Sequence, residues 1–155
     1  DGEGFVAGLA SAGHDVAGKA CLLVGAGGAA SAIAFALAAH GCASLTITNR
    51  TASRAESLAA RVRAACPGAD VRAGAPEGRR YDLAINGTSL GMKPDDALPM
   101  SDAVVAASTV VAECVLAPEK TRLLEVAGAQ GRVVHTGVPM LTAQMELMLR
   151  FMGVA

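Results

Sequence analysis

The chain is poor in aromatic and charged residues, and each shortage narrows what it can be. It has no tryptophan, one tyrosine and three phenylalanines among 155 residues, so its core must be built from aliphatic side chains and methionine. Only 17% of the residues are charged and 52% are hydrophobic, which excludes a disordered chain. The 13 Lys and Arg residues are balanced by 14 Asp and Glu residues, so the chain lacks the excess of basic residues that is typical of nucleic-acid binding. The length is that of one domain.

Cysteine and histidine do not occur in metal-binding patterns. The four cysteines are far apart, with no C-x-x-C pair, and the histidines lack the spacing of a zinc site. Cys21 and Cys114 fall in apolar runs, so we expect them to be small buried hydrophobic residues. His14, His40 and His135 lie at the ends of predicted elements, where a structural role is the simpler interpretation. We therefore expect no metal site.

The sequence gives no convincing signal for secretion or for a membrane. The first five residues include two acids and no base, unlike the start of a signal peptide, so we expect a cytoplasmic protein. Residues 20–49 carry no formal charge and are long enough to span a bilayer. Glycines at positions 25, 27 and 28, and later His40-Gly41, interrupt this stretch. Two short strands around one buried helix explain it better.

Short apolar runs and helix-forming segments alternate along the chain. Strands are predicted at 20–24, 45–48, weakly near 71, and at 81–86, 109–116 and 132–135. Helices are predicted at 2–13, 29–40, 53–65, 119–128 and 141–152, with an irregular segment around prolines 94 and 99. This alternation predicts an α/β fold, a doubly wound, Rossmann-like parallel sheet of about six strands with helices on both faces. Residues 1–155 would form this one domain.

A glycine-rich turn follows the first predicted strand. Gly25-Ala26-Gly27-Gly28-Ala29-Ala30 matches G-x-G-x-x-(G/A), and it closes a strand and opens a helix, as the dinucleotide-binding fingerprint requires. We therefore expect Gly25, Ala26, Gly27, Gly28 and Ala29 to contact a pyrophosphate at the helix N-terminus. The alternative is a strand–helix turn without a ligand. A P-loop is excluded because no G-K-[ST] follows.

The end of the second predicted strand indicates which nucleotide binds. An NAD site usually places Asp or Glu there to hold the ribose 2′-hydroxyl. This chain has Asn49-Arg50-Thr51 instead, with Arg54 one helical turn further on. Arg50 offers a planar set of donors to a 2′-phosphate, and Thr51 adds a hydroxyl. We expect NADP rather than NAD or the S-adenosylmethionine of a methyltransferase, the alternative being that both arginines are only solvated.

Several segments together resemble the shikimate dehydrogenase family. They run in family order over the whole chain: Asp1-Gly2-Glu3-Gly4-Phe5, the Gly25 to Ala30 turn, Asn49 to Arg54, Ile85-Asn86-Gly87-Thr88-Ser89-Leu90-Gly91-Met92, and Gly137-Val138-Pro139-Met140-Leu141-Thr142-Ala143-Gln144. Family members have an N-terminal substrate lobe and a C-terminal NADP lobe, with the active site between them. The resemblance implies that this chain is the C-terminal lobe alone, beginning at the aspartate that closes an Asn-Thr-Asp-Gly motif.

The resemblance also assigns the substrate residues. Asp1 matches the catalytic aspartate, which binds a substrate hydroxyl and works with a lysine of the other lobe. Lys19, Lys93 and Lys120 do not lie in that lysine's motif, so the chain alone is expected to bind NADP without turning over substrate. Gln144 matches a glutamine that reaches the substrate from the last helix, although by pattern alone it could be a surface residue.

Further cofactor contacts follow from the same resemblance. Thr88 and Ser89 match a loop beside the cofactor, and Gly137 and Met140 match residues that line the nicotinamide. Cys114, in the second half of the fifth predicted strand, is also expected to contact the cofactor. The other methionines of the last helix are expected to pack in the core or between lobes; they are Met145, Met148 and Met152.

The implied activity is reversible hydride transfer between NADPH and 3-dehydroshikimate, a step towards chorismate and the aromatic amino acids. Members usually have an aspartate in the fifth strand and a tyrosine a few residues later, near the substrate. Here the segment is Glu113 to Pro118, and Leu116 replaces the tyrosine, so a quinate-type or other ring acid stays open. A nucleotide-binding sensor module without chemistry is the alternative function, and a homodimer is left open.

Overall fold

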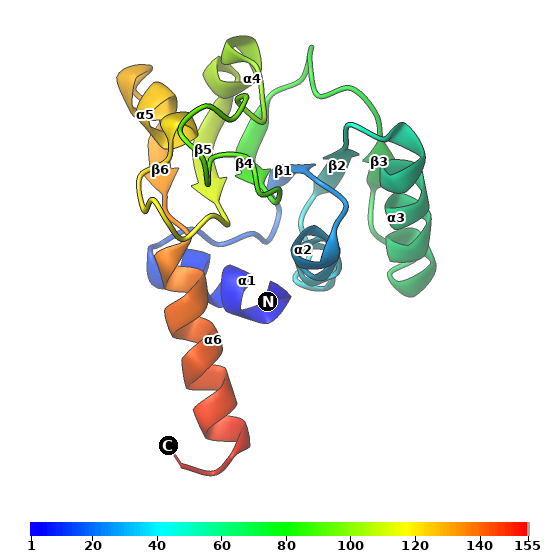
Figure 1. The fold of residues 1–155 in the computed structure, drawn as a ribbon. Coiled ribbons are helices and arrows are strands. Elements are labelled where there is room, and N and C mark those ends of the chain that lie inside the picture. The colour runs from blue at the N-terminus through cyan, green and yellow to red at the C-terminus, as the bar shows by residue number, and fades with distance from the viewer. Residues whose placement is uncertain (155) are drawn as a thin grey trace.

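In the computed structural model, which describes residues 1–154, six parallel strands form one sheet in the order β3-β2-β1-β4-β5-β6 (Figure 1). The strands are β1 (Ala20–Val24), β2 (Ser44–Thr48), β3 (Val71–Ala73), β4 (Tyr81–Asn86), β5 (Ser108–Glu113) and β6 (Val133–His135). The helices are α1 (Gly2–Ser11), α2 (Gly28–Ala39), α3 (Ala52–Ala65), α4 (Asp102–Ala106), α5 (Arg122–Ala129) and α6 (Val138–Phe151). The predicted doubly wound α/β fold is confirmed.

Side chains of the central strands alternate between two apolar layers, because successive residues of a strand point to opposite faces. Cys21 and Leu23 of β1 pack in the layer that contains α1, α2 and α3. Leu22 and Val24 pack in the layer that contains α4 and α5. Both faces of the strands are therefore apolar, which explains why the strands read as continuous hydrophobic runs. No helix within residues 1–154 is long and apolar enough to cross a membrane.

Glycines let α1 lie unusually close to its neighbours. A Cβ on Gly4 would lie 2.9 Å from the Met140 carbonyl oxygen, and a Cβ on Gly8 would lie 2.8 Å from the Pro139 carbonyl carbon. Both neighbours belong to α6, so α1 holds the first half of that helix by backbone contact. The second half extends away from the sheet (Figure 1), and Phe151 near its end is 94% exposed.

The fifth strand ends earlier than predicted. It stops at Glu113 rather than at residue 116. The Cys114 N–H still donates to the Asn86 carbonyl of β4 (3.1 Å), and the Glu113 carboxylate also accepts from the N–H groups of Cys114 (3.1 Å) and Val115 (3.3 Å). The next helix starts at 122 rather than 119, since Thr121 is its N-cap and its hydroxyl accepts from the Leu124 N–H at 3.4 Å.

Two further helix predictions are corrected. The last helix begins at Val138 instead of 141, with Pro139 in its first turn, where a missing N–H costs nothing. The segment expected to be irregular after prolines 94 and 99 contains α4, a short helix capped by Ser101. Five residues are too few to show helical periodicity in a sequence.

One connection departs from the expected alternation of strand and helix. Residues 74–80 lead from β3 to β4 without a helix. In Figure 1 this segment loops over the sheet between the two strands. The Tyr81 hydroxyl holds it in place by donating to the Pro76 carbonyl at 2.7 Å. The face of the sheet opposite α2 and α3 is therefore covered by α4 and α5, with no helix contributed by the connection between β3 and β4.

The close contact of α1 with α6 can be tested at Gly8. Gly8→Ala should lower the free energy of unfolding by about 1–3 kcal/mol, because its methyl group would overlap the backbone at Pro139. Gly128→Ala is the matched control. Gly128 lies in α5, and outside its own helix no heavy atom of residues 1–154 lies within 4 Å of the added Cβ, so a gain of about 0.5–1 kcal/mol is expected. Urea unfolding of both variants measures the difference, and equal stabilities would contradict the described packing.

Candidate functional site

The glycine turn lies at the carboxyl edge of the sheet, where the strand order reverses between β1 and β4. Gly25 follows β1 with a φ of +119°, and its N–H donates to the Thr48 carbonyl at 2.8 Å. A Cβ on Gly25 would lie 3.0 Å from the Gly87 carbonyl oxygen and 3.1 Å from Thr88 Cγ2. The protein itself therefore requires glycine here, for backbone conformation and for packing.

Gly27 and Gly28 are different, because no protein atom requires them to be glycine. A Cβ on either residue would meet no heavy atom within 4 Å among residues 1–154. Gly27 is the N-cap of α2, and the first turn of that helix has no acidic residue and no side-chain cap within the described chain. Its N–H groups are therefore available to an anion. The open space outside this helix start fits the pyrophosphate that the sequence predicts.

A second anion-binding feature lies between β2 and α3. Asn49 Nδ2 donates to the Thr51 carbonyl at 3.1 Å, which fixes the turn around Arg50. Thr51 is the N-cap of α3, and its hydroxyl makes no capping bond in the described chain. Arg50 and Arg54 are exposed, and within residues 1–154 neither guanidinium pairs with a carboxylate. Guanidinium groups without a partner beside a helix N-terminus suit a dianionic phosphate.

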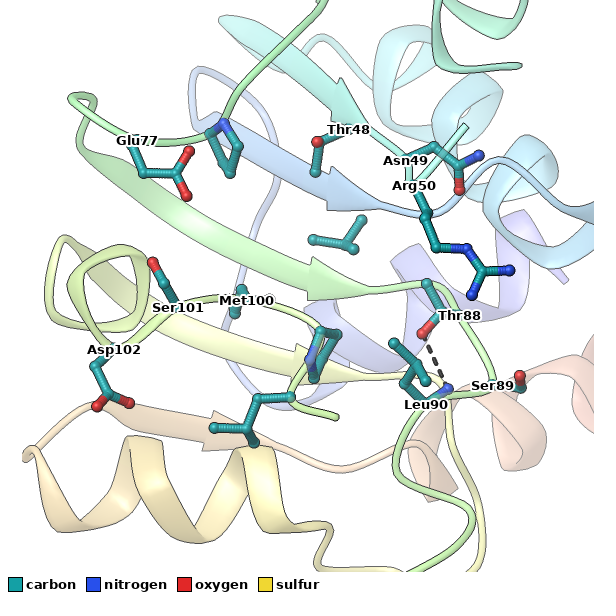
Figure 2. A pocket seen from close by; sticks show the side chains of 14 residues that line it. Thr48, Asn49, Arg50, Glu77, Thr88, Ser89, Leu90, Met100, Ser101 and Asp102 are labelled. Atoms are coloured by element: carbon teal, nitrogen blue, oxygen red, sulfur yellow. Dashed lines mark hydrogen bonds between the residues drawn. The ribbon is translucent and has the colours of Figure 1, made fainter. Parts of the chain in front are cut away.

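A cavity of about 850 Å³ extends from Asn49 and Arg50 of the second feature across the face of the sheet (Figure 2). It brings together four of the predicted cofactor residues: Asn49, Arg50, Thr88 and Ser89. In Figure 2 the Arg50 side chain extends toward Thr88 across the opening. The residues from Gly25 to Ala29, together with Thr51 and Arg54, lie outside the lining.

The loop that carries Thr88 is held by a buried hydrogen-bond network. Asn86 Nδ2 donates to Glu113 Oε1 at 2.7 Å and to the Leu90 carbonyl at 2.9 Å. Asn86 Oδ1 accepts from the Thr88 hydroxyl at 2.6 Å and from its N–H at 3.0 Å. Thr121 Oγ1 donates to the other carboxylate oxygen of Glu113 at 2.8 Å. The Thr88 hydroxyl is thus committed to the loop, which leaves its methyl group to contact the glycine turn.

Sequence reasoning missed Glu113 as a site residue. Its side chain is fully buried, and burial raises its pKa, although four hydrogen-bond donors oppose this shift by favouring the carboxylate. The sequence did contain a signal for this residue, because Glu113 is the one charged residue in the fifth predicted strand, 109–116. Burial and the neighbouring carboxylate of Glu113 also raise the pKa of the Cys114 thiol to about 12.

The two predicted substrate residues meet at a second pocket. Asp1 and Gln144 line a hollow of about 520 Å³ between the start of α1 and the outer half of α6. Its other walls include Met148 and Met152, which are exposed, as is Met145. The sequence predicted that these methionines pack either in the core or between lobes. Because all three are exposed, the prediction of packing in the core of this domain is wrong.

A comparison with protein-family models matches residues 9–88 to the family described as shikimate / quinate 5-dehydrogenase. The chain belongs to this family. A shikimate dehydrogenase (NADP(+)) from Symbiobacterium thermophilum is 40% identical over 156 residues, which cover 93% of this chain and 52% of the relative. The chain therefore spans about half the length of the curated relatives that it matches.

Solved structures of similar fold extend the comparison. The ligand-free 5-ketofructose reductase of Gluconobacter sp. strain CHM43 has a TM-score of 0.84 and 35% identity, covering 97% of this chain and 56% of its own. Shikimate 5-dehydrogenase from Listeria monocytogenes, in complex with shikimate and NAD, has a TM-score of 0.82 and 31% identity over 93% of this chain and 54% of its own. The shikimate dehydrogenases among these similar proteins are named with NADP or with NAD, and the reductase is named for a different substrate.

Three residues assigned by the family resemblance lie near the end of β5 and the start of α6: Cys114, Gly137 and Met140. Gly137 sits directly on the backbone after β5, because a Cβ there would lie 2.6 Å from the Val115 carbonyl oxygen and 3.0 Å from that of Cys114. Met140 is buried in the core beside α1, and Cys114 is partly buried against that core. Their cofactor contacts stay predictions.

The described residues 1–154 contain no cluster of three or more His, Cys, Asp or Glu side chains placed for a metal.

The buried carboxylate of Glu113 gives a pH-dependent stability. Since its folded pKa is raised, the unfolded chain loses this proton first, so stability falls as pH rises from about 4.3 through the folded pKa. Glu113→Gln should remove this contribution while keeping the shape. The measurement is urea unfolding of both proteins at several pH values. The wild-type minus variant difference should decline with pH, and a difference that grows with pH would contradict a raised pKa.

Proposed function

We propose that this chain is the NADP-binding half of an oxidoreductase that interconverts 3-dehydroshikimate, or a closely related ring ketone, with the alcohol. The observation that carries the proposal is the placement of two anion-binding features at one edge of the sheet. One is the open glycine turn at the start of α2, and the other is Arg50, which lacks an acidic partner within residues 1–154. Together they fit a dinucleotide with an additional phosphate.

The cofactor-binding residues divide by the group that each would hold. The N–H groups that follow Gly27 would hold the pyrophosphate, and Arg50, Thr51 and Arg54 would hold the 2′-phosphate. Thr88 and Ser89 would border the cofactor from the loop that Glu113 fixes. NADPH, when bound, supplies the hydride for reduction of the ketone. A carboxylate at position 50 would repel the 2′-phosphate that Arg50 attracts.

The substrate half of the site is proposed to lie between Asp1, Gln144 and a second lobe. Asp1 would accept a hydrogen bond from a substrate hydroxyl, and Gln144 would orient the same ring. The family resemblance implies a lysine from the other lobe as the proton donor, paired with Asp1. This division is supported by the chain's covering about half of its relatives, and by the exposed apolar side chains on the outer half of α6. The domain alone would then bind cofactor without turnover.

Leu116 removes the hydroxyl that a tyrosine would offer, and a second substrate class is suggested by a similar protein of solved structure. The Leu116 side chain is 40% exposed beyond the end of β5 and has no hydroxyl to offer a polyhydroxylated acid. Since the 5-ketofructose reductase is 35% identical to this chain, a ketose is the second candidate. Both candidates use the same cofactor-binding residues.

The cofactor assignment is tested by titrating the chain with NADP and with NAD at one salt concentration. Each charge-assisted hydrogen bond contributes about 1.5–3 kcal/mol, so NADP should bind roughly ten- to a hundredfold more tightly. Arg50→Ala should abolish this preference. Arg61→Ala is the control, because Arg61 is an exposed arginine of α3 outside the cavity lining. Equal binding of NAD by the wild type would contradict the assignment.

The pyrophosphate site is tested at Gly28. Gly28→Ala should leave the free energy of unfolding within about 1 kcal/mol of the wild type, because the added methyl group meets no protein atom within 4 Å. The same methyl group would occupy space needed by the phosphates, so NADP affinity should fall about tenfold or more. Calorimetric titration measures it, with Gly128→Ala as the control. Unchanged NADP binding by Gly28→Ala would mean that these glycines form only a turn.

A further inference from the structure

One buried histidine lies outside both pockets and takes no part in the hydrogen-bond network of Glu113. His135 is the last residue of β6, and its side chain is only 4% exposed. Its Nε2 atom is the one buried side-chain nitrogen or oxygen of residues 1–154 that has no hydrogen-bond partner. Burying such an atom costs free energy, and the cost rises steeply if the ring becomes charged.

The imidazole of His135 packs against α1 and against the segment that follows this helix. The centroid of the buried Phe5 ring of α1 lies 6.4 Å from the centroid of the imidazole, and the two rings are perpendicular. The His14 ring is also perpendicular to the imidazole, at a centroid distance of 5.9 Å. The His14 N–H donates to the Leu9 carbonyl at 2.8 Å, which ties His14 to the end of α1. His135 therefore supports α1 at two points, the middle of the helix and its C-terminal end.

These surroundings suit the neutral ring and oppose the charged one. Burial lowers the pKa of His135, and the neighbouring His14 lowers it further. A protonated imidazole carries two N–H donors. The Phe5 side chain has no oxygen or nitrogen to accept from them, and a protonated His14 would carry the same charge. Among residues 1–154 no carboxylate pairs with His135 to compensate.

The other charged groups on the elements around His135 have different partners or lie in other places. They are Asp1 and Glu3 of α1, Asp15 beside His14, Glu113 of β5, Arg122 and Glu125 of α5, and Arg132 beside β6. Glu3 lies 2.9 Å from His40 Nε2. Asp15 accepts from the Ala17 N–H at 3.0 Å. Arg132 donates to the Ser108 carbonyl at 3.4 Å, and the two charged groups of α5 line a pocket in the opposite layer. His14 is therefore the neighbour whose charge acts on His135.

We propose that His135 is an acid-sensitive latch for α1: its protonation releases α1 from β6 and disrupts the hollow that Asp1 and Gln144 share. In the released state water reaches Nε2 and solvates the charge. Because α1 begins at Asp1 and holds the first half of α6 by backbone contact, its release separates the two residues. His135 lines neither that hollow nor the cavity beside Arg50, so the latch does not depend on which cofactor or substrate binds.

The latch acts below neutral pH. A histidine with a lowered folded pKa makes its full contribution to stability above the ordinary histidine pKa of about 6.5. This contribution is lost as pH falls from there through the folded pKa, because the released state binds the proton first. Glu113 acts in the opposite direction, since its raised folded pKa makes stability increase as pH falls. The effects of the two groups therefore differ in sign.

Amide hydrogen exchange, followed by NMR at several pH values, tests the latch. The protection factors of α1 amides should fall about tenfold between pH 7.5 and 5.5, because linkage changes an opening equilibrium by about tenfold per pH unit below the ordinary pKa. Those of α3, beside the opposite edge strand β3, should stay within about twofold. His135→Phe keeps a ring without its titration and should remove the pH dependence in α1. His40→Gln is the matched control, because His40 also contacts α1, and it should keep the tenfold fall.

A second measurement needs no variant. The ring C–H signals of His135 in the wild type should titrate below pH 6.5. Titration at or above pH 6.5, constant α1 protection in the wild type, or an equal fall in His135→Phe would each overturn the latch. An equal loss of protection in α3 would overturn it as well, because it would mean that the whole domain opens. A fall confined to α1, and to proteins that retain His135, supports it.

Discussion

The arrangement of the site depends on one buried carboxylate, that of Glu113, which has no cationic partner within residues 1–154. Glu113 is the last residue of β5, and its carboxylate accepts a hydrogen bond from Asn86 at the end of β4. It also accepts from the N–H groups of the two residues that follow it. Through Asn86 it also fixes Thr88, whose methyl group lies against the glycine turn. The carboxyl ends of β1, β4 and β5 are thereby linked to one another by these contacts. Removing the carboxylate would leave several buried donors unsatisfied at once.

A second constraint is steric and acts on the other side of the sheet. The glycines of α1 bring its backbone against α6, so the part of α6 that carries Met140 and Gln144 is fixed by contact with α1. Asp1 is the N-cap of α1, and it reaches the same hollow as Gln144 for that reason. The relative position of the two predicted substrate residues is therefore set by small residues, which contribute no chemistry themselves.

Sequence reasoning predicted the fold because its elements carry strong local patterns. β1 and β4 have the predicted bounds, since each is an apolar run between turn residues. The errors lie where a side chain competes with the backbone, as at Glu113, or where an element is too short to show a period, as in α4. The glycine turn and the Asn49–Arg54 segment were recognisable from spacing. The cavity beside Arg50 was not, because it depends on the absence of a helix between β3 and β4 and on segments far apart in sequence.

That missing helix makes one face of the sheet incomplete as a layered structure. In an α/β domain each face of the sheet is normally covered by secondary structure. Here β1 and β2 face a hollow bordered by Pro76, Leu98 and Met100. A ligand seated there would act as part of the missing layer, shielding strand residues that the protein covers only thinly. Because it would bind only the native domain, it would stabilise that domain by an amount that grows with the ratio of free ligand concentration to Kd. Occupancy and folding would be coupled, so the concentration of the ligand in the cell would help to determine how much of this protein persists in the folded state.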